Sequence, residues 1–101
     1  MKTSKHPEPD ITGTRSYVIG RAGHIFIDHE SVSREHAEII LADNKIRLRD
    51  LNSTNGVFLI YGEQTKRIQE EIIELDQHFL LGSKKCTARD LLNSLKRADS
   101  L

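Results

Sequence analysis

The chain is predicted to fold as an all-β sandwich of short antiparallel strands, followed by one short C-terminal helix. From Ser16 onward, short apolar segments alternate with turn signals at close spacing, which is the pattern of β-sandwiches and barrels. After residue 87 the apolar residues recur at helical spacing instead. The 101 residues fit one domain. Because aromatic content is 5% and Trp is absent, Ile, Leu and Val must build the core.

Several segments are expected to form strands. The clearest is 46–49, where two apolar residues alternate with two arginines and so define one inward face. Segment 67–75 carries two adjacent glutamates, which suggests a bulge or hairpin corner rather than one straight strand. The other expected strands are residues 17–19, 24–27, 37–41, 57–60 and 78–81, with a polar last strand near 84–87.

Residues 88–98 are expected to form a helix. Thr87 suits the N-cap position, and Asp90 then stands at the third helical position, an acidic variant of the capping box. An apolar stripe that includes Leu91 and Leu95 is more often packed on a core than offered to a partner. The expected organisation is a disordered lead over residues 1–10, the sandwich domain over 11–87, and the helix over 88–101, packed on or beside the sandwich.

Composition excludes several classes of function. Fifteen basic and fifteen acidic residues give a formal net charge of zero, which argues against a nucleic-acid binder. No apolar run approaches the ~20 residues of a membrane helix, and the N-terminus lacks the apolar stretch of a secretory signal. Cys86 is the only cysteine and the five histidines are scattered, so we expect no metal and no other cofactor. These features predict a cytoplasmic protein without a membrane partner.

Two short segments carry side chains of possible chemical use. Gly20-Arg21 ends an expected strand and, taken alone, is most simply a turn glycine beside a solvated arginine. Ser33 lies three residues before His36, a spacing that could suit a nucleophile and its base, but no Gly-x-Ser-x-Gly elbow surrounds the serine. The simpler interpretation is that His36 hydrogen-bonds loop backbone and holds the turn.

A third segment, residues 50–56, reads DLNSTNG and lies between two expected strands. It would by default be only a loop, yet it is dense in short side chains that form hydrogen bonds. Asn55-Gly56 is a strong short-range hairpin signal because both residues tolerate positive φ.

In this order, with strands between them, the three segments resemble the signature of the forkhead-associated (FHA) domain, a phosphothreonine-peptide-binding module. The resemblance runs from about Tyr17 to Gly82. The blocks Gly20-Arg21, 33–36 (SREH) and 50–56 match the family's signature residue for residue. It implies an FHA-type β-sandwich whose loops at one end form the peptide site.

The resemblance also implies a role for each matching residue. Arg21 and Ser33 contact the phosphate, and Arg34 lies beside it as a second positive charge. Thr54 contributes near the phosphothreonine, and Asn55 holds the peptide main chain. The loop-shaping positions are Gly20, His36, Ser53 and Gly56. Ser31, in a loop where family members read the residue three places after the phosphothreonine, is small and neutral and predicts no strong charge preference.

Elementary chemistry agrees with these roles. A phosphate brings almost two negative charges and three acceptor oxygens, and a guanidinium meets two of those oxygens in a planar fork. Each charge-assisted bond contributes about 1.5–3 kcal/mol. Three or four such bonds, set against peptide ordering, predict affinity on the order of micromolar.

The resemblance therefore predicts a phosphothreonine-dependent adaptor in Ser/Thr-kinase signalling, without catalytic machinery of its own. One alternative is a phospho-independent scaffold or dimerisation module that uses the same fold. A small hydrolase built on Ser33 and His36 is a further alternative, which lacks an identifiable orienting carboxylate.

This sequence departs from the family pattern mainly in the first strand. Only residues 10–14 are available for it here, and they are polar and include Gly13, so this strand is expected to be short or missing. An uncovered sheet edge can pair with another chain. The protein is therefore expected to be a monomer, or a homodimer formed through an exposed edge strand.

Overall fold

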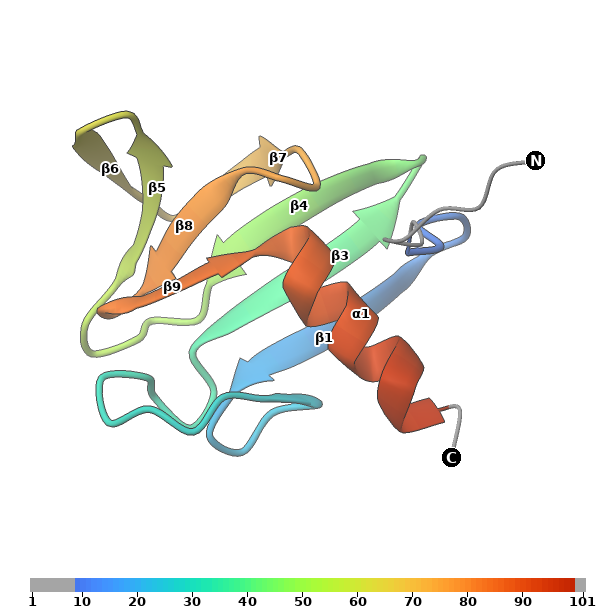
Figure 1. Ribbon diagram of the computed structural model, residues 1–101, viewed down its shortest axis with the longest axis horizontal. Coiled ribbons are helices and arrows are strands. Elements are labelled where there is room, and N and C mark those ends of the chain that lie inside the picture. Colours follow the sequence, from blue (N-terminus) through green and yellow to red (C-terminus); the bar gives the residue numbers. More distant parts are fainter. Residues whose placement is uncertain (1–8, 100–101) are drawn as a thin grey trace.

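Two β-sheets form the body of the structure, a computed structural model that describes residues 9–99 of the chain (Figure 1). Over this range the elements are β1 (Arg15–Gly20), β2 (Ile25–Phe26), β3 (Ala37–Ala42), β4 (Lys45–Asp50), β5 (Val57–Tyr61), β6 (Gln64–Ile68), β7 (Glu70–Ile73), β8 (His78–Leu81), β9 (Lys84–Thr87) and α1 (Ala88–Asp99). One sheet has the strand order β2-β1-β3-β4-β7, and the other has the order β6-β5-β8-β9. The predicted all-β fold with a C-terminal helix is confirmed.

The alternation seen in the sequence sets which side chains face inward. Along β4, exposed and buried residues alternate over the whole strand, and Ile46 and Leu48 point into the core. The preceding β3 is joined to it through Asp43 and Asn44, whose φ angles are 56° and 59°. Positive φ at both central residues gives a hairpin turn whose twist matches that of the antiparallel strands.

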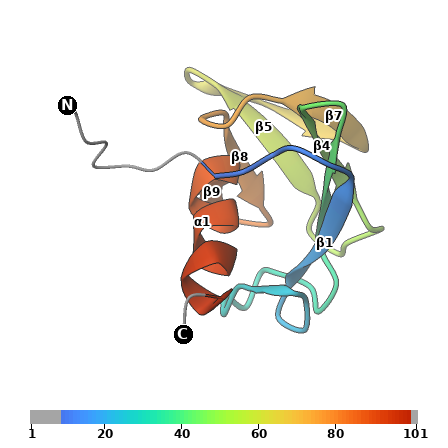
Figure 2. The same cartoon turned by 90° about the vertical axis from the view of Figure 1, so that its right-hand side faces the viewer.

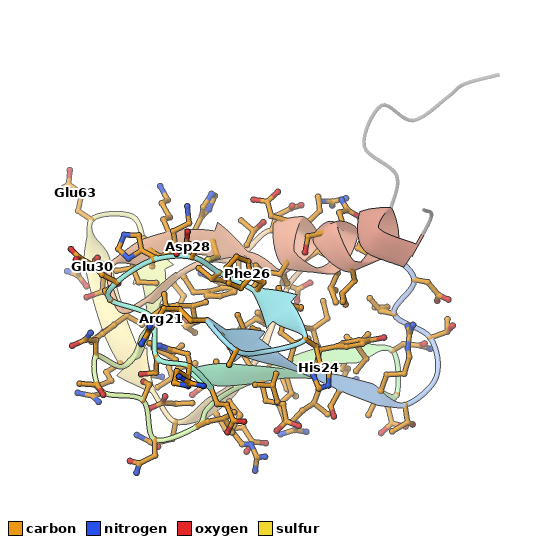
Figure 3. All side chains as sticks on the ribbon, turned by 90° about the horizontal axis from the view of Figure 1, so that it is seen from below. Arg21, His24, Phe26, Asp28, Glu30 and Glu63 are labelled. Atoms are coloured by element: carbon orange, nitrogen blue, oxygen red, sulfur yellow. The ribbon has the colours of Figure 1, made fainter. Side chains whose placement is uncertain are left out.

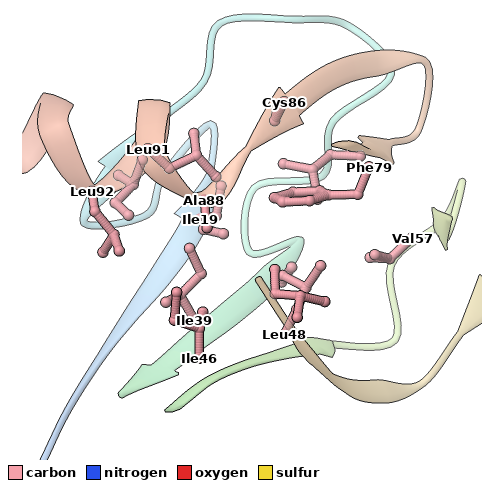
Figure 4. Close-up of a cluster of buried hydrophobic side chains, with 14 of the residues drawn as sticks. Ile19, Ile39, Ile46, Leu48, Val57, Phe79, Cys86, Ala88, Leu91 and Leu92 are labelled. Atoms are coloured by element: carbon pink, nitrogen blue, oxygen red, sulfur yellow. The ribbon is translucent and has the colours of Figure 1, made fainter. Parts of the chain in front are cut away.

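The core lies between the two sheets, which pack face to face in the edge-on view of Figure 2. Side chains from both layers meet there: Ile39 and Leu48 come from the five-stranded sheet, and Val57 and Phe79 come from the four-stranded sheet (Figure 4). Phe79 is fully buried and is the largest such side chain. The rest of the core is mostly Ile, Leu and Val, as the composition predicts.

Helix α1 packs against β9 and β2, the edge strands of the two sheets, and so covers one side of the sandwich (Figure 2). Leu91 and Leu92 are buried in this contact. The backbone N–H of Asp90 donates to Oγ1 of Thr87 at 3.1 Å, which confirms the predicted N-cap. Within the described part of the chain, no helix is long and apolar enough to cross a membrane.

One strand pair differs from the expected antiparallel arrangement. β1 and β2 pair in parallel, with Ile19 opposite Ile25 and Gly20 opposite Phe26. After Gly20 the chain makes a loop over residues 21–24 and returns alongside β1 in the same direction. The Ile27 N–H then donates to the Gly20 carbonyl at 3.1 Å, which closes this loop.

The corner expected within 67–75 is the point where the chain changes sheets. β6 ends at Ile68 in the four-stranded sheet, and β7 begins at Glu70 in the five-stranded sheet. Between them, the carbonyl of Gln69 accepts the N–H of Asp50 at 2.8 Å. The adjacent glutamates therefore mark a crossover between layers rather than a bulge in one strand.

The disordered lead predicted over residues 1–10 overlaps the described range at its last two positions. Pro9 is buried, and the Asp10 carboxylate accepts the N–H and the hydroxyl of Thr12 at 2.9 and 2.6 Å. The remaining residues of the predicted lead, 1–8, lie outside the described range. Within residues 9–99 the first strand is β1, so the strand expected to be short or missing is not formed over 10–14.

Candidate functional site

Long loops gather at one end of the sandwich, onto which Figure 3 looks. They are residues 21–24 between β1 and β2, 27–36 between β2 and β3, and 51–56 between β4 and β5. The β8–β9 turn, residues 82–83, joins them there. The three sequence segments that resemble the FHA signature therefore lie together, although they are far apart along the chain.

His36 links two of these loops from inside the protein. Its side chain is fully buried. Nδ1 accepts the backbone N–H of Ser33 at 2.9 Å, and Nε2 lies 2.8 Å from the carbonyl oxygen of Gly56. Because Nδ1 is an acceptor, the ring is the neutral tautomer whose Nε2–H donates to Gly56. His36 therefore forms hydrogen bonds with backbone atoms of both loops.

This geometry also excludes the catalytic pair considered for Ser33 and His36. Both ring nitrogens are engaged with backbone atoms, so neither can take a proton from the Ser33 hydroxyl. Among the described residues, no three His, Cys, Asp or Glu side chains gather as metal ligands would.

Arg21 presents a guanidinium at the surface directly after β1. The side chain is exposed, as predicted, and Figure 3 shows it among the loops. Its Nε donates to the carbonyl oxygen of Val32 at 2.7 Å, and its backbone N–H donates to the Ser33 carbonyl at 3.1 Å. These bonds fix the position of the Arg21 side chain and leave both Nη groups without a partner among the described residues. Two parallel donors are thereby available to an anion.

The hydroxyl of Ser33 lies between the two main loops. Its Oγ accepts the backbone N–H of Thr54 at 3.2 Å, so the hydroxyl hydrogen stays available as a donor. Thr54 is exposed, as are Arg34 and Asn55. The Asn55 amide donates to the carbonyl oxygen of Ser31 at 2.9 Å, which adds a further link between the β4–β5 loop and the β2–β3 loop.

The β4–β5 loop is held by side chains within it and at the end of β4. The Asp50 carboxylate accepts the Ser53 N–H at 3.1 Å, and the Ser53 hydroxyl accepts the Gly56 N–H at 3.0 Å. The hairpin predicted at Asn55-Gly56 is wrong: β4 and β5 belong to different sheets, and of these two residues only Gly56 has positive φ, at 86°. The second left-handed residue of the loop is Asn52, with φ of 58°.

Gly20 is required because there is no space for a side chain at this position, and not because of its φ angle. A Cβ at this position would lie 2.2 Å from the carbonyl oxygen of Arg34 and 2.6 Å from that of Ser33. Both are backbone atoms of the β2–β3 loop and cannot move aside cheaply. The absence of a side chain at Gly20 therefore lets this loop pass over the end of β1.

Four residues that shape the site were not assigned this role from the sequence: Ser31, Gly82, Ser83 and Asp50. The Ser31 hydroxyl accepts the Ser83 N–H at 2.9 Å and lies 2.9 Å from Nδ1 of His29. Gly82 leaves room for this contact, because a Cβ there would lie 2.4 Å from the Ser31 carbonyl oxygen. The sequence offers no signal for a bond that spans 52 residues. The Asp50 to Ser53 spacing, by contrast, is typical of side-chain-to-backbone bonds in turns and could have been noticed.

The chain belongs to the FHA domain family, whose model matches residues 17–82. It is similar to the FHA domain of FhaA, solved in complex with the intracellular domain of Rv3910; the match is 30% identical, covers 69% of this chain and 75% of that one, and has a TM-score of 0.59. An FHA domain from Chlamydia trachomatis is 30% identical over 70% of this chain and 72% of its own, with a TM-score of 0.62.

A third similar structure is Mycobacterium tuberculosis EmbR in complex with a low-affinity phosphopeptide. It is 29% identical, covers 71% of this chain and 19% of that chain, and has a TM-score of 0.61. No curated protein sequence matches the chain. The recognised family and the two-sheet fold together define this chain as an FHA-type binding module.

Proposed function

We propose that this domain binds phosphothreonine-containing peptides at its loop end. In this proposal the Arg21 Nη groups and the Ser33 hydroxyl bind the phosphate, and Arg34 adds a second positive charge. Thr54 contacts the phosphothreonine residue, and Asn55 binds the peptide main chain. The related EmbR structure holds a phosphopeptide, and another FHA structure, 30% identical to this chain, concerns phosphothreonine-dependent interactions.

One observation supports the proposal above the others. Arg21 is exposed and is anchored by its Nε and its backbone N–H, and its two Nη groups have no partner among the described residues. Its backbone N–H bonds the carbonyl of Ser33, whose hydroxyl accepts the Thr54 N–H and keeps its own hydrogen available. A donor set of this kind is prepared for a tetrahedral anion before the anion arrives. The binding energy therefore need not be used to order the arginine.

Substitution of Arg21 by Ala tests the proposal directly. We expect phosphopeptide binding to weaken by about 2–4 kcal/mol, because a charge-assisted fork at a partly solvated site is lost. Isothermal calorimetry with a phosphothreonine peptide library measures the change, and circular dichroism checks the fold. Arg47→Ala is the matched control, since Arg47 is an exposed arginine on the outer face of the five-stranded sheet. Binding within twofold of wild type in Arg21→Ala would contradict the proposed site.

The domain should prefer phosphothreonine over phosphoserine. Both residues present the same phosphate, so the preference would come from the threonine methyl in a small apolar niche among the loops. One buried methyl contributes about 0.8 kcal/mol, which corresponds to a preference of several-fold. Titration with matched peptides that differ only by this methyl measures it, and equal affinities would show that the phosphate alone is read.

The same proposal places the domain as an adaptor downstream of a Ser/Thr kinase. It would act in the cytoplasm, without catalysis, without a nucleic-acid or membrane partner and without a cofactor. Whether it acts as a monomer or as a homodimer through an edge strand is measured by light scattering with and without phosphopeptide.

A further inference from the structure

A row of four side chains crosses the outer face of the four-stranded sheet. The strand register places Arg67 opposite Phe58, Phe58 opposite Leu80, and Leu80 opposite Lys85. Neighbouring residues in these strands point into the core, and alternation therefore directs the four outward. The neighbours that are buried are Val57, Leu59, Ile68, Phe79, Leu81 and Cys86. We refer to Arg67, Phe58, Leu80 and Lys85 as the outer row.

The outer row has an apolar centre with one cation at each end. Phe58 and Leu80 are half-buried, whereas Arg67 and Lys85 are exposed. The Arg67 guanidinium lies over the Phe58 ring, 5.7 Å from its centroid, which holds it in place. Among the described side chains, neither cation forms an ion pair, although the adjacent Lys66 pairs with Glu71 at 3.5 Å.

The outer face of the five-stranded sheet is different. Its two central arginines are neutralised within the protein: Arg47 pairs with Glu70 at 3.1 Å, and Arg49 pairs with Glu38. The two outward-facing arginines of β4 are therefore ion-paired, whereas the two cations of the outer row are not.

The outer row is continuous with the loop end of the sandwich. A Cβ at Gly56 would lie 3.1 Å from Cζ of Arg67 and 3.1 Å from Cε1 of Phe58. Gly56 directly follows Asn55, the residue proposed to bind the peptide main chain. A peptide seated at Asn55 thus lies next to the start of the outer row, and its next few residues can reach Phe58 and Leu80 in extended form.

We propose that the outer row binds a second segment of the phosphorylated partner, in which a large apolar residue is flanked by Asp or Glu. The inference rests on the proposed phosphothreonine binding. The apolar residue packs on Phe58 and Leu80, and the flanking carboxylates pair with Arg67 and Lys85. Because the segment belongs to the same chain as the phosphothreonine, its contact is intramolecular once the phosphate is bound.

The expected gain is modest and depends on salt. Each exposed ion pair contributes only a few-fold in affinity, so two pairs and one apolar contact together should give about tenfold. Raising the ionic strength from 0.05 to 0.5 M should remove most of the ionic part, because exposed charges are screened. This dependence separates the outer row from a purely apolar contact.

The experiment titrates ¹⁵N-labelled protein with three groups of synthetic peptides. The first is a short phosphothreonine peptide with neutral flanks. The second carries Glu-Leu-Glu a few residues to the N-terminal or C-terminal side of the phosphothreonine, and the third carries Lys-Leu-Lys at the same places. The variant is Arg67→Gln combined with Lys85→Gln. The control is Lys45→Gln, which removes an exposed lysine at the start of β4.

We expect the acidic extension on one side to bind about tenfold more tightly than the short peptide, with amide shifts that spread from the loops to β5, β6 and β8. The double variant should lose this gain but still bind the short peptide, and Lys45→Gln should behave as wild type. If the short peptide binds and neither acidic extension improves it by twofold, the outer row is not a binding surface. A gain that survives in the double variant would also contradict the inference. If no phosphopeptide binds at all, the proposed function itself is wrong.

Discussion

The two ends of the sandwich are built in different ways. At one end, strands are joined by short turns whose shape is set by the residues in the turn. Asp43 and Asn44 of the β3–β4 hairpin have φ angles of 56° and 59°, and Gly62 of the β5–β6 hairpin has a φ of 62°. At the other end, the loops are long, and their shape depends on hydrogen bonds between residues that are distant in sequence.

Those bonds span large parts of the chain. His36 and Gly56 are 20 residues apart, Asn55 and Ser31 are 24 apart, and Ser31 and Ser83 are 52 apart. Such loops keep their shape only while every strand that carries them is in place. The difference shows that the end with the proposed binding residues is the end where a single substitution can act at a distance. Of the four predictions below, those on His36, Gly20 and Asp76 test this difference, and the one on Cys86 concerns a strand between the two ends.

His36→Ala should have the largest effect. It removes two hydrogen bonds and leaves the Ser33 N–H without its partner, whereas the Gly56 carbonyl still accepts the Gly82 N–H at 2.9 Å, so the free energy of unfolding should fall by about 2–4 kcal/mol. Urea denaturation measures this loss. His24→Ala is the control, because His24 is exposed and should cost less. An unchanged melting temperature together with lost peptide binding would instead place His36 in the ligand contact.

Gly20→Ala should be the next most damaging substitution. Its methyl group would meet the Arg34 carbonyl, so the β2–β3 loop must shift, at a cost of about 1–3 kcal/mol. Gly62→Asn is the matched substitution at the other end. Nothing lies within 4 Å of a Cβ there, and Asn tolerates positive φ. Thermal unfolding compares the two, and an equal loss in both would remove the contrast between the ends.

Cys86 lies in β9, away from both ends, and should make the free energy of unfolding fall at alkaline pH. Burial raises the pKa of its thiol from 9.0 to about 11. Between those pH values the unfolded chain loses the thiol proton and the folded chain keeps it. The free energy of unfolding is therefore unaffected by this group below pH 9 and falls as the pH rises towards 11. Cys86→Ala should flatten this part of the pH profile relative to wild type. Parallel profiles for both proteins would mean that other groups cause the decline.

Asp76→Asn should have the smallest effect. A hydrogen bond from Arg89 lowers the pKa of the Asp76 carboxyl, and the Nε–Oδ1 distance is 2.7 Å. The carboxylate is 70% exposed, so the ion pair should contribute little to the free energy of unfolding. Its contribution is present at neutral pH and disappears as the pH falls through the lowered pKa. Chemical denaturation at pH 7 and pH 2 should therefore show a slight difference at pH 7 only; a large one would mean that this turn also depends on tertiary contacts.

Much of the fold could be predicted because its signals are local. Alternation in 46–49 identified a strand and its inward face, and the Thr87 to Asp90 spacing identified the start of the helix. The three signature segments were found because each keeps its loop residues close together in sequence. The exposed Arg21 and the bracing role of His36 followed from their positions beside strands.

Only the tertiary structure decided which strands share a sheet. The Asn55-Gly56 signal was interpreted as a hairpin, although the same loop can equally carry the chain from one sheet to the other. The parallel pairing of β1 and β2 and the crossover at Gln69 were settled in the same way. Sequence patterns act over a few residues, whereas sheet membership and the bond from Ser83 to Ser31 depend on segments that meet only after folding.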